Sequence, residues 1–474
     1  MFHRSALNRI ALAALVAVTW VVVLFRIQPW PFSDYAVFLA VARRLNAGEV
    51  LYEGIWDNKD PLVYYSIALL QGLGQPALWA LEALWFIIAG LSIYVISRRY
   101  SISQSWSIFL GAVATPIILI PFHYFPGTTH LPGVALSLAA IALMITGRFA
   151  ASGVALGFLF FFKLSMLPIA IAGIAIIVIQ QRSRRDLMPL GLGTVITLAI
   201  GGVILVIRGE FIPYLNSLLH NFTYSQTNTA TGGTGPLASI SERIEVLTDV
   251  HVLITTATIA AALAITAPRR RTLQLWDVTT GTFVVAMLSI VAIGKFPHHA
   301  QVLGVSAALV TVVLALRFTS LRTGAPLFGA VLGLVFAIAL TGLPYVKGYR
   351  DALINPQGTW VAMTSVDSST QDLLDSGPPR SFAIVQGGGL PRSPGLEDWD
   401  LACRHIAQRP WESAELLQES LDCFPTADVL LVPQGFTPAS EPEAYADFTK
   451  SVDTLLRNDY ECSDASQSTV CVKK

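Results

Sequence analysis

Charged residues are scarce in this chain. Only 13% of its 474 residues are Asp, Glu, Lys or Arg, whereas roughly a quarter are charged in an average soluble domain. Hydrophobic residues make up 53% of the chain, and the mean hydropathy is +0.59. This composition excludes a soluble enzyme and indicates a polytopic α-helical membrane protein. No basic face interleaved with aromatic residues is present, so a nucleic-acid partner is not expected.

Cysteine is also scarce, and its placement is informative. All four residues fall near the C-terminal end of the sequence: Cys403, Cys423, Cys462 and Cys471. No CxxC spacing is present, which favours disulfides over the competing zinc site. Three pairings are possible, and we favour Cys403 with Cys423 and Cys462 with Cys471, because the second bond would close one terminal hairpin. Disulfides persist outside the cytoplasm, so this tail is expected there.

Long apolar runs dominate the rest of the sequence. About eleven of them are long enough to span a membrane, or nearly so, and allowing for short segments the expected range is about 11 to 13 transmembrane helices. The runs are 8–27, 77–97, 104–121, 131–147, 149–163, 165–181, 188–207, 249–267, 276–294, 300–317 and 326–345. A further apolar piece, 61–74, is too short for a straight crossing and is expected to be a re-entrant or interfacial helix, or a strongly tilted span.

The basic residues predict the orientation. If the spans alternate, most Arg residues fall on one side, which the positive-inside rule identifies as the cytoplasm. The N-terminus is then cytoplasmic, and the tail and the loops 28–60, 121–130, 208–248 and 295–299 face outward. Of the 12 acidic residues before residue 346, only Asp186 and Asp277 fall at the cytoplasmic side. The polar chemistry is therefore expected outside.

The chain divides near residue 346. Residues 1–345 contain 21 basic and 12 acidic residues, whereas residues 346–474 contain 10 and 19. The segments SFAIVQ at 381–386 and DVLLVPQ at 428–434 predict buried strands, and 449–460 predicts an amphipathic helix followed by a hairpin. The sequence thus predicts a transmembrane domain and a small extracytoplasmic α/β domain.

The outward loop 28–60 contains the first acidic candidate. Ser33 and Asp34 open a predicted helix whose apolar positions lie on one side and which ends at Gly48. This helix is expected to lie along the membrane surface. Asp34 is either an acid stabilised by the dipole of the helix N-terminus, or a general base at the mouth of a membrane cavity. Tyr35 beside it is a candidate for substrate contact.

Charged residues occur at two places next to or within apolar sequence. Asp57, Lys59 and Asp60 directly precede Pro61, and they form either a solvated loop cluster or a substrate-binding group. Lys163 interrupts the apolar run GFLFFFKLSM. Because an unpaired ammonium in hydrocarbon costs at least about 2.5 kcal/mol, Lys163 is expected to line an outward cavity and to meet an anion there.

Other polar residues collect in two outward loops: His123, Tyr124 and His130 of PFHYFPGTTHLPG, and Lys295, His298, His299 and Gln301 of KFPHHAQ. A lone histidine near a span is usually a hydrogen-bonded structural residue. Adjacent histidines where a loop re-enters the membrane are candidates for contact with a substrate or a metal.

These segments, taken in order, resemble one family. They are similar to segments of bacterial GT-C glycosyltransferases of the ArnT and protein-mannosyltransferase type. The similar segments are the first-loop sequence SDYAVFLAVARRLNAGEVLYEGIWDNKDPLVYY, the aromatic second outer loop, GFLFFFKLSM, KFPHHAQVL and an α/β tail ending in a hairpin. The resemblance covers nearly the whole chain. It implies the GT-C fold and an enzyme that transfers one sugar from a polyprenyl-phosphate carrier to an acceptor outside the cytoplasmic membrane, with inversion at the anomeric carbon.

The resemblance also implies roles for individual residues. Asp34 corresponds to the first-loop acid that acts as the catalytic base. The KDPL at 59–62 matches the family's Lys-Pro-Pro-Leu signature, whose lysine lies near the donor phosphate, and Lys163 matches the basic residue of a Gly-Leu-x-x-Leu-x-Lys segment. His298 and His299 match a Pro-His-Tyr loop. The expected phosphate ligands are Lys59, Lys163 and Lys295, and the expected substrate contacts are Asp57, Asp60, Tyr35, His123, Tyr124, His130, His298, His299 and Gln301.

The chain departs from the family pattern at two places. Many relatives carry a second acid in the next outer loop, where this chain offers His123, Tyr124, Thr128, Thr129 and His130 but no carboxylate, so acceptor recognition is expected to differ. Asp60 replaces the first proline of the signature, which leaves open whether Asp57, Asp60 or neither supplements the base. No segment has a strong metal-ligand spacing, so we expect no cofactor and no metal requirement. A divalent ion, if one binds, would lie among the outward acids and histidines.

The sequence therefore predicts a glycosyltransferase of the bacterial cytoplasmic membrane. Its expected partners are a polyprenyl-phosphate sugar, an extracytoplasmic glycan, lipid or protein acceptor, and membrane lipids. A flippase or transporter of lipid-linked sugars is one alternative, for which inverted repeats or charges near the membrane midplane would be expected. A polymerase or ligase of lipid-linked oligosaccharides is another, and it would contain one very large loop between spans. A non-catalytic envelope scaffold is the third.

Overall fold

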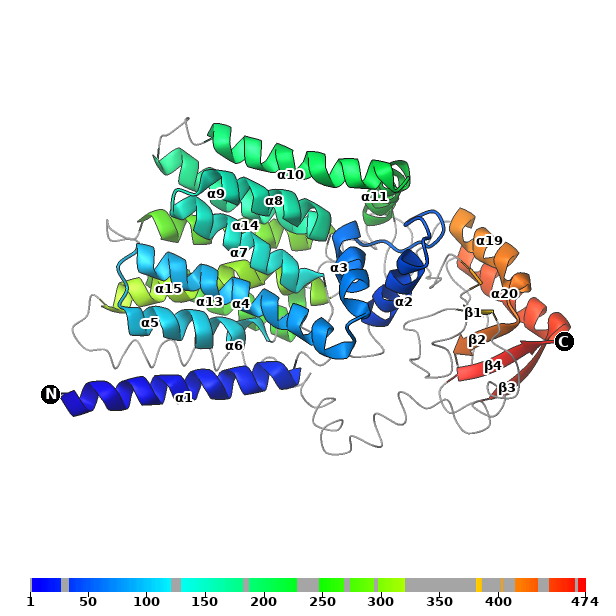
Figure 1. Cartoon of the computed structure of the whole chain (residues 1–474), viewed down its shortest axis with the longest axis horizontal. Helices are drawn as coiled ribbons and strands as arrows, with labels where there is room; N and C mark the ends of the chain where they lie inside the picture. Colours follow the sequence, from blue (N-terminus) through cyan, green and yellow to red (C-terminus); the bar gives the residue numbers. More distant parts are fainter. Residues whose placement is uncertain are drawn as a thin grey trace.

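The protein is a bundle of long apolar helices with a small mixed domain at one end (Figure 1). The computed structural model describes residues 2–26, 34–120, 129–181, 187–227, 247–267, 273–293, 297–319, 381–385, 402–403, 414–433, 443–464 and 468–474. The bundle contains α1 (Phe2–Arg26), α4 (Gln75–Arg99), α5 (Gln104–Phe109), η1 (Leu110–Ala114), α6 (Thr115–Leu119), α7 (His130–Ile145), α8 (Phe149–Lys163), α9 (Leu167–Gln181), α10 (Leu187–Ile207), α13 (Val250–Ile265), α14 (Leu273–Ile293) and α15 (Gly304–Thr319).

Five helical stretches are long and apolar enough to cross a membrane by length and composition: Pro76–Arg99, Phe149–Gln181, Leu187–Ile207, Gln274–Ala292 and His299–Arg317. Shorter apolar helices accompany them, among them Gln104–Leu119 and His130–Ile145. This agrees with a polytopic membrane protein. The predicted span at 326–345 lies outside the described residues, so the total number of spans stays a prediction.

The stretch Phe149–Gln181 runs along the bundle twice, because the chain reverses after Lys163. Ser152 donates a hydrogen bond to the Ala140 carbonyl at 2.8 Å, and a Cβ on Gly133 would lie 3.2 Å from that of Lys163, so α8 is antiparallel to α7. The same Cβ would lie 2.7 Å from Met166 Cγ, and one on Gly173 would lie 2.8 Å from Ile141 Cδ1. α9 is therefore parallel to α7, which agrees with the prediction of two separate spans at 149–163 and 165–181.

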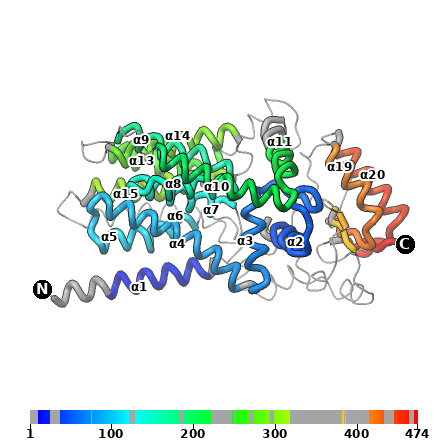
Figure 2. Tube along the Cα trace, turned by 45° about the horizontal axis from the view of Figure 1, so that its top comes forward, coloured from blue at the N-terminus to red at the C-terminus, as the bar shows by residue number. Residues whose placement is uncertain are grey.

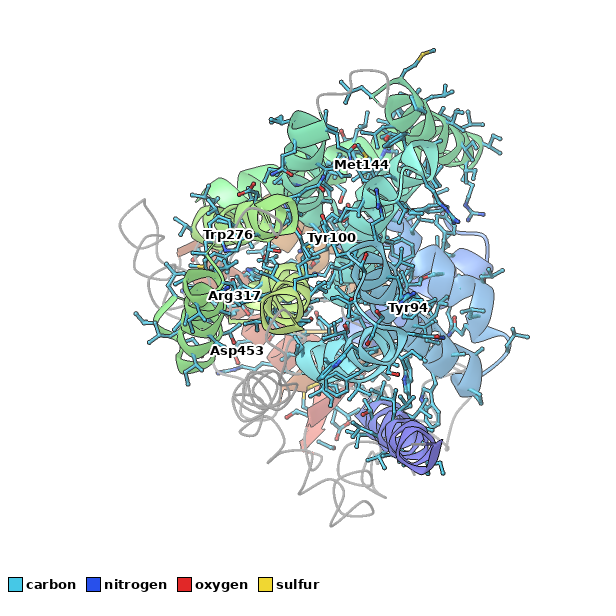
Figure 3. The ribbon with its side chains drawn as sticks, turned by 90° about the vertical axis from the view of Figure 1, so that its left-hand side faces the viewer. Tyr94, Tyr100, Met144, Trp276, Arg317 and Asp453 are labelled. Atoms are coloured by element: carbon cyan, nitrogen blue, oxygen red, sulfur yellow. A yellow bond between two sulfur atoms is a disulfide. The ribbon has the colours of Figure 1, made fainter. Side chains whose placement is uncertain are left out.

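The bundle has two chemically different ends, which we call the Arg99 end and the Lys163 end. At the Arg99 end, the Tyr100 hydroxyl donates to Gln274 at 3.2 Å, and Gln180 donates to Asp277 at 2.5 Å. Figure 3 looks along the helices from this side, with Tyr100, Met144, Trp276 and Arg317 labelled near the ends of α4, α7, α14 and α15. At the Lys163 end lie the shorter helices α2 (Asp34–Asn46), α3 (Pro61–Gln71), α11 (Phe211–Thr227) and η4 (Pro297–Leu303).

Helix α2 is more buried than its sequence predicted. The predicted apolar positions Val37, Phe38, Val41 and Leu45 are all buried, but so are those at 39, 40 and 42. The helix packs against α3 and lies between α3 and the mixed domain in Figure 1. A helix on an open membrane surface would leave one face exposed. The amphipathic pattern identified the helix, but it did not reveal that other elements cover it.

The C-terminal domain has the predicted strands and terminal hairpin. Its sheet contains β1 (Phe382–Ile384), β2 (Val429–Pro433), β3 (Tyr460–Asp464) and β4 (Ser468–Lys473), in the order β1-β2-β4-β3. β1 and β2 are parallel, and the other two pairs are antiparallel. In the described part of the domain, the α-helices are α19 (Ala414–Cys423) and α20 (Glu443–Asp459). α20 begins six residues earlier than the helix predicted at 449–460.

The two faces of this sheet belong to different cores. Leu430 and Val432 of β2 pack with Tyr445 and Phe448 of α20, whereas Val429 and Leu431 join the apolar cluster of the bundle. Residues alternate across a strand, so β2 is buried on both faces. The disulfides Cys403–Cys423 and Cys462–Cys471 are present, and the favoured pairing is confirmed.

Helices α8 and α10 approach each other closely through glycine. A Cβ on Gly193 would lie 2.1 Å from the Ala150 carbonyl oxygen, and one on Gly153 would lie 2.0 Å from that of Leu190. Contacts this short leave no room for any side chain. Small residues at such crossings let helix backbones pack directly in a membrane.

Substitution of Gly193 by Ala should separate the two helices and lower the free energy of unfolding by about 1–3 kcal/mol, the usual cost of overpacking. Gly191, two residues earlier on α10, has nothing within 4 Å of its Cβ position and provides a matched control. Gly191→Ala should leave stability unchanged or raise it slightly. Thermal unfolding in detergent compares the two variants, and equal melting temperatures would show that α8 and α10 are not in close contact.

Candidate functional site

Residues 51–60 form a tight turn between α2 and α3 at the Lys163 end. The Tyr52 amide donates to the Ile55 carbonyl at 2.7 Å, and Tyr52 has a positive φ of 68°. The left-handed region costs a residue with a side chain roughly 1–2 kcal/mol. The Tyr52 side chain offsets this cost, because its hydroxyl donates to the Lys59 carbonyl at 2.7 Å and its ring stacks on Tyr214 with centroids 5.7 Å apart. The turn is therefore held in one conformation.

Asp57 and Lys59 are joined through Tyr64 on α3. The Tyr64 hydroxyl donates to Asp57 Oδ2 at 2.6 Å and accepts the Lys59 amide at 3.2 Å. Lys59 Nζ donates to Asn58 Oδ1 at 2.7 Å. The segment is thus ordered by its own hydrogen bonds, and the Lys59 ammonium stays at the partly exposed surface of the turn.

Asp60 joins three parts of the chain. It occupies the N-cap position of α3 but makes no side-chain cap; its carboxylate instead accepts the Leu164 amide at 3.1 Å and the Tyr214 hydroxyl at 3.2 Å. Burial raises the pKa of Asp60, while the Leu164 amide and the nearby charge of Lys163 oppose the shift. The pKa of Tyr214 is also raised, mainly by burial and further by the Asp60 carboxylate. Asp60 therefore fixes the reversal at Lys163 and helix α11 against the turn.

Lys163 lies next to the first turn of α7, where two of the predicted histidines meet. Its Cβ and Cγ lie within 3.3 Å of the Cβ position of Gly133. His130, the buried first residue of α7, has its ring centroid 6.2 Å from that of His299 on η4. Gln301, also on η4, is 2% exposed, and neither polar atom of its amide has a hydrogen-bond partner among the described residues. A buried amide without partners is unusual in a folded protein.

Glu210 is an important residue that the sequence analysis did not identify. It is fully buried and accepts hydrogen bonds from Arg208 Nε at 3.0 Å, from the Leu51 amide at 3.3 Å and from the Tyr65 hydroxyl. Arg208 also lies over the Tyr65 ring, 5.2 Å from its centroid. This carboxylate therefore connects the start of the turn, α3 and the end of α10.

Helix α11 closes the other side of the turn. The Asn221 amide donates to the Asn58 carbonyl at 2.9 Å, and the His220 ring meets Trp56 edge to face, with centroids 5.4 Å apart. Burial lowers the pKa of His220, whereas the charge of Glu415 on α19 raises it. His220 thus lies between the turn and the C-terminal domain.

Of the predicted residues, the structure places Asp57, Lys59 and Asp60 in the turn, with Lys163 close to Asp60. His130 and His299 lie close together, and Gln301 is on η4 with His299, where η4 packs against α7. Asp34 is the first residue of α2 and Tyr35 the second, but their side chains lie outside what the structure describes, as does that of His298. His123, Tyr124 and Lys295 fall outside the described residues altogether. Their expected roles stay predictions.

One sequence signal could have revealed Glu210. Arg208 follows a span at its predicted outward end, against the positive-inside rule, and such a charge needs a nearby partner. No local pattern could have revealed Tyr214 or Asn221, because their partners are 154 and 163 residues away in the chain.

Metal binding is not evident in the part of the chain that the structure describes. Within it, no three His, Cys, Asp or Glu residues are close enough to hold an ion. The expectation that the protein needs no metal stays untested.

Two solved structures share this fold across nearly the whole chain. ArnT from Cupriavidus metallidurans bound to undecaprenyl phosphate has a TM-score of 0.58 and 13% identity, covering 98% of this chain and 97% of that one. ArnT from the same organism in the apo state has a TM-score of 0.55 and 14% identity, covering 99% and 98%. No protein-family model and no curated protein matches the sequence. The chain therefore has an ArnT-like fold, as its sequence motifs predicted.

Removal of the Glu210 carboxylate should destabilise the turn. Glu210→Ala leaves the Leu51 amide, the Tyr65 hydroxyl and Arg208 without their acceptor, and should lower the free energy of unfolding by about 3 kcal/mol. Glu210→Gln keeps one acceptor oxygen and should lose less. Chemical unfolding in detergent measures both, with exposed Glu461→Ala as the control. Equal losses in the Ala and Gln variants would contradict this account.

Asp60 should make stability depend on pH. Because its pKa is raised, the folded chain holds this proton more tightly than the unfolded chain does. The resulting stabilisation is complete below the ordinary carboxyl pKa of about 4 and is lost as the pH rises through the raised pKa. The wild type should therefore lose stability relative to Asp60→Asn as the pH rises from about 4 to neutral.

Melting temperatures of both proteins across this pH range measure the difference. Asp447→Asn removes an exposed carboxylate of α20 and corrects for the change in net charge. A difference in melting temperature between wild type and Asp60→Asn that stays constant with pH would rule out titration of Asp60 as a source of pH-dependent stability.

Proposed function

We propose that the protein is an inverting membrane glycosyltransferase that moves one sugar from a polyprenyl phosphate to a cell-envelope acceptor. The observation that carries this proposal is the meeting of Lys163, Lys59 and ordered carboxylates at one end of the bundle. The fold is shared with ArnT bound to undecaprenyl phosphate. A lysine pair at the membrane boundary suits a lipid-linked phosphate, whose isoprenoid would lie between helices.

The reaction needs cations and a base. The acceptor hydroxyl attacks the anomeric carbon from the face opposite the phosphate, a new carbon–oxygen bond forms, and the bond to the phosphate oxygen breaks with inversion. The carrier leaves as a polyprenyl phosphate, and its developing negative charge would be stabilised by Lys59, Lys163 and Lys295. The proton of the acceptor hydroxyl passes to a carboxylate.

Asp34 is the proposed base. Asp57 already accepts a hydrogen bond from Tyr64, and Asp60 accepts hydrogen bonds from Leu164 and Tyr214, which suits carboxylates that position a segment rather than ones that receive a proton. Asp34 is the first residue of α2, the helix that precedes the turn in the chain. Gln301, with its unpartnered amide, and His130 and His299 are proposed to contact the substrate.

The proposed setting is the bacterial cytoplasmic membrane, with the Lys163 end and the C-terminal domain outside. Arg98, Arg99 and Arg317 lie in the last turns of α4 and α15, at the opposite end. Basic residues favour the cytoplasmic side, and the two disulfides of the tail favour an oxidising one. The same chemistry leaves the acceptor open among a glycan, a lipid and a protein.

Transfer of radiolabelled sugar from a panel of polyprenyl-phosphate monosaccharides, by protein purified in detergent, tests the proposal. Asp34→Asn should reduce kcat by at least about 100-fold, the usual contribution of a general base. Lys163→Met should reduce kcat/KM by about 100-fold through loss of phosphate stabilisation. Lys450→Met, which alters an exposed lysine of α20, should retain full activity.

The outcomes distinguish the alternatives. Folded wild type that transfers no sugar from any donor, but moves the lipid-linked sugar across vesicles, would favour a flippase. Transfer of whole oligosaccharides would favour a polymerase or ligase, and undiminished transfer by Asp34→Asn would remove Asp34 from the mechanism.

A further inference from the structure

Helix α11 has two chemically different faces. Gly209, with a φ of 75°, ends α10 as glycine commonly does at this position, and α11 then turns out of line with α10 (Figures 1 and 2). One face, which we call the inner face, carries Tyr214, Ser217 and Asn221 at helical spacing. Tyr214 and Ser217 are both buried, and Asn221 reaches the turn at Asn58.

The opposite side exposes large apolar residues. This outer face of α11 consists of Phe211, Ile212, Leu215 and Leu219. Ile212 is 62% exposed and Leu219 is 66% exposed. Exposure of such side chains to water is unfavourable by roughly 25 cal/mol for each Å² of apolar surface, so a continuous stripe of them indicates a contact with something apolar.

The outer face continues an apolar surface of the bundle. Val203, Ile204, Val206 and Ile207, in the last turn and a half of α10, are all strongly exposed, and Leu187–Ile207 is one of the stretches suited to cross a membrane. Residues exposed on such a helix face lipid. The outer face of α11 follows this surface after only three residues, Arg208, Gly209 and Glu210.

We propose that the outer face of α11 is a lipid-contact surface, seated at the boundary between headgroups and acyl chains. An amphipathic helix that lies across the direction of its neighbouring span, with large apolar residues on one side, is typical of such a position. The occupant is membrane lipid rather than a second protein, because the surface is continuous with that of α10.

This contact is coupled to the site. The inner face binds Asp60 through Tyr214 and the Asn58 carbonyl through Asn221, so lipid that supports the outer face also supports the turn. This part of the inference rests on the proposed function, whereas the lipid contact itself does not.

Site-directed labelling tests the contact. All four cysteines of the chain are in disulfides, so an introduced cysteine supplies the single free thiol. Leu219→Cys reports on α11, Ile200→Cys on the exposed apolar face of α10, and Ser451→Cys on an exposed polar site of α20. Each variant carries an environment-sensitive fluorophore in phosphatidylcholine and phosphatidylglycerol vesicles with brominated acyl chains.

Bromine quenches only a fluorophore that contacts the acyl chains. The label at Leu219→Cys should be quenched at least half as strongly as that at Ile200→Cys, and bromines near the headgroup should quench it more than bromines deep in the chain. Ile200→Cys should show the reverse depth preference, and Ser451→Cys should show no quenching. Quenching at Leu219→Cys no greater than at Ser451→Cys overturns the inference, as does a blue-shifted label that bromine does not reach, because that result indicates a protein partner.

A double variant tests the coupling. Ile212→Gln with Leu219→Gln makes the outer face polar without altering the inner face, and in vesicles it should lower kcat for sugar transfer several-fold with KM little changed. The wild type should show the same loss when detergent replaces lipid, and the double variant should lose nothing further. Equal kcat for both proteins in vesicles overturns the coupling. If no sugar is transferred by either protein, the labelling still decides the lipid contact.

Discussion

The Asp60 carboxylate is the interaction on which the Lys163 end depends. A carboxylate removed from water is stable only if donors and a positive charge surround it, and Asp60 obtains these from Leu164, Tyr214 and Lys163. These partners come from two distant parts of the chain, the reversal at residues 163–164 and helix α11. The need of this partly buried acid for partners therefore fixes the end of α8, helix α11 and the turn relative to one another. Glu210, four residues before Tyr214, joins Leu51, Tyr65 and Arg208 in a similar way.

The sequence predicted what local periodicity and composition can specify. The long apolar runs matched the helices from α4 to α15 except α11, which lies in the predicted outward loop 208–248. The hairpin and the buried strands of the tail were correct, and the few cysteines allowed the correct pairing. Lys163 was expected to meet an anion because an isolated charge in an apolar run needs one, and the structure places it beside Asp60. Prediction succeeded where the physical cause lies within a few residues.

Prediction failed where the cause is a distant contact. Nothing near Glu210 in the sequence indicates that it accepts the Leu51 amide, and Tyr214 resembles any other aromatic residue of an amphipathic helix. The burial of α2 was missed because its own sequence does not indicate which elements cover it, among them the next helix, α3. In the tail, Val429 and Leu431 face the bundle while Leu430 and Val432 face α20. A continuous apolar strand indicates burial on both faces, but it does not indicate what lies on each.

The strand order of the tail has a consequence for its biogenesis. β4 is made after β1, β2 and β3, yet it lies between β2 and β3 and pairs with both. During synthesis, β2 and β3 therefore lack the strand that pairs with both of them until β4 has been made. The bond between Cys403 and Cys423 can close before β4 is made, whereas Cys462 meets its partner only when the hairpin forms. Formation of the Cys403–Cys423 bond therefore does not depend on the terminal hairpin, whereas formation of the Cys462–Cys471 bond does.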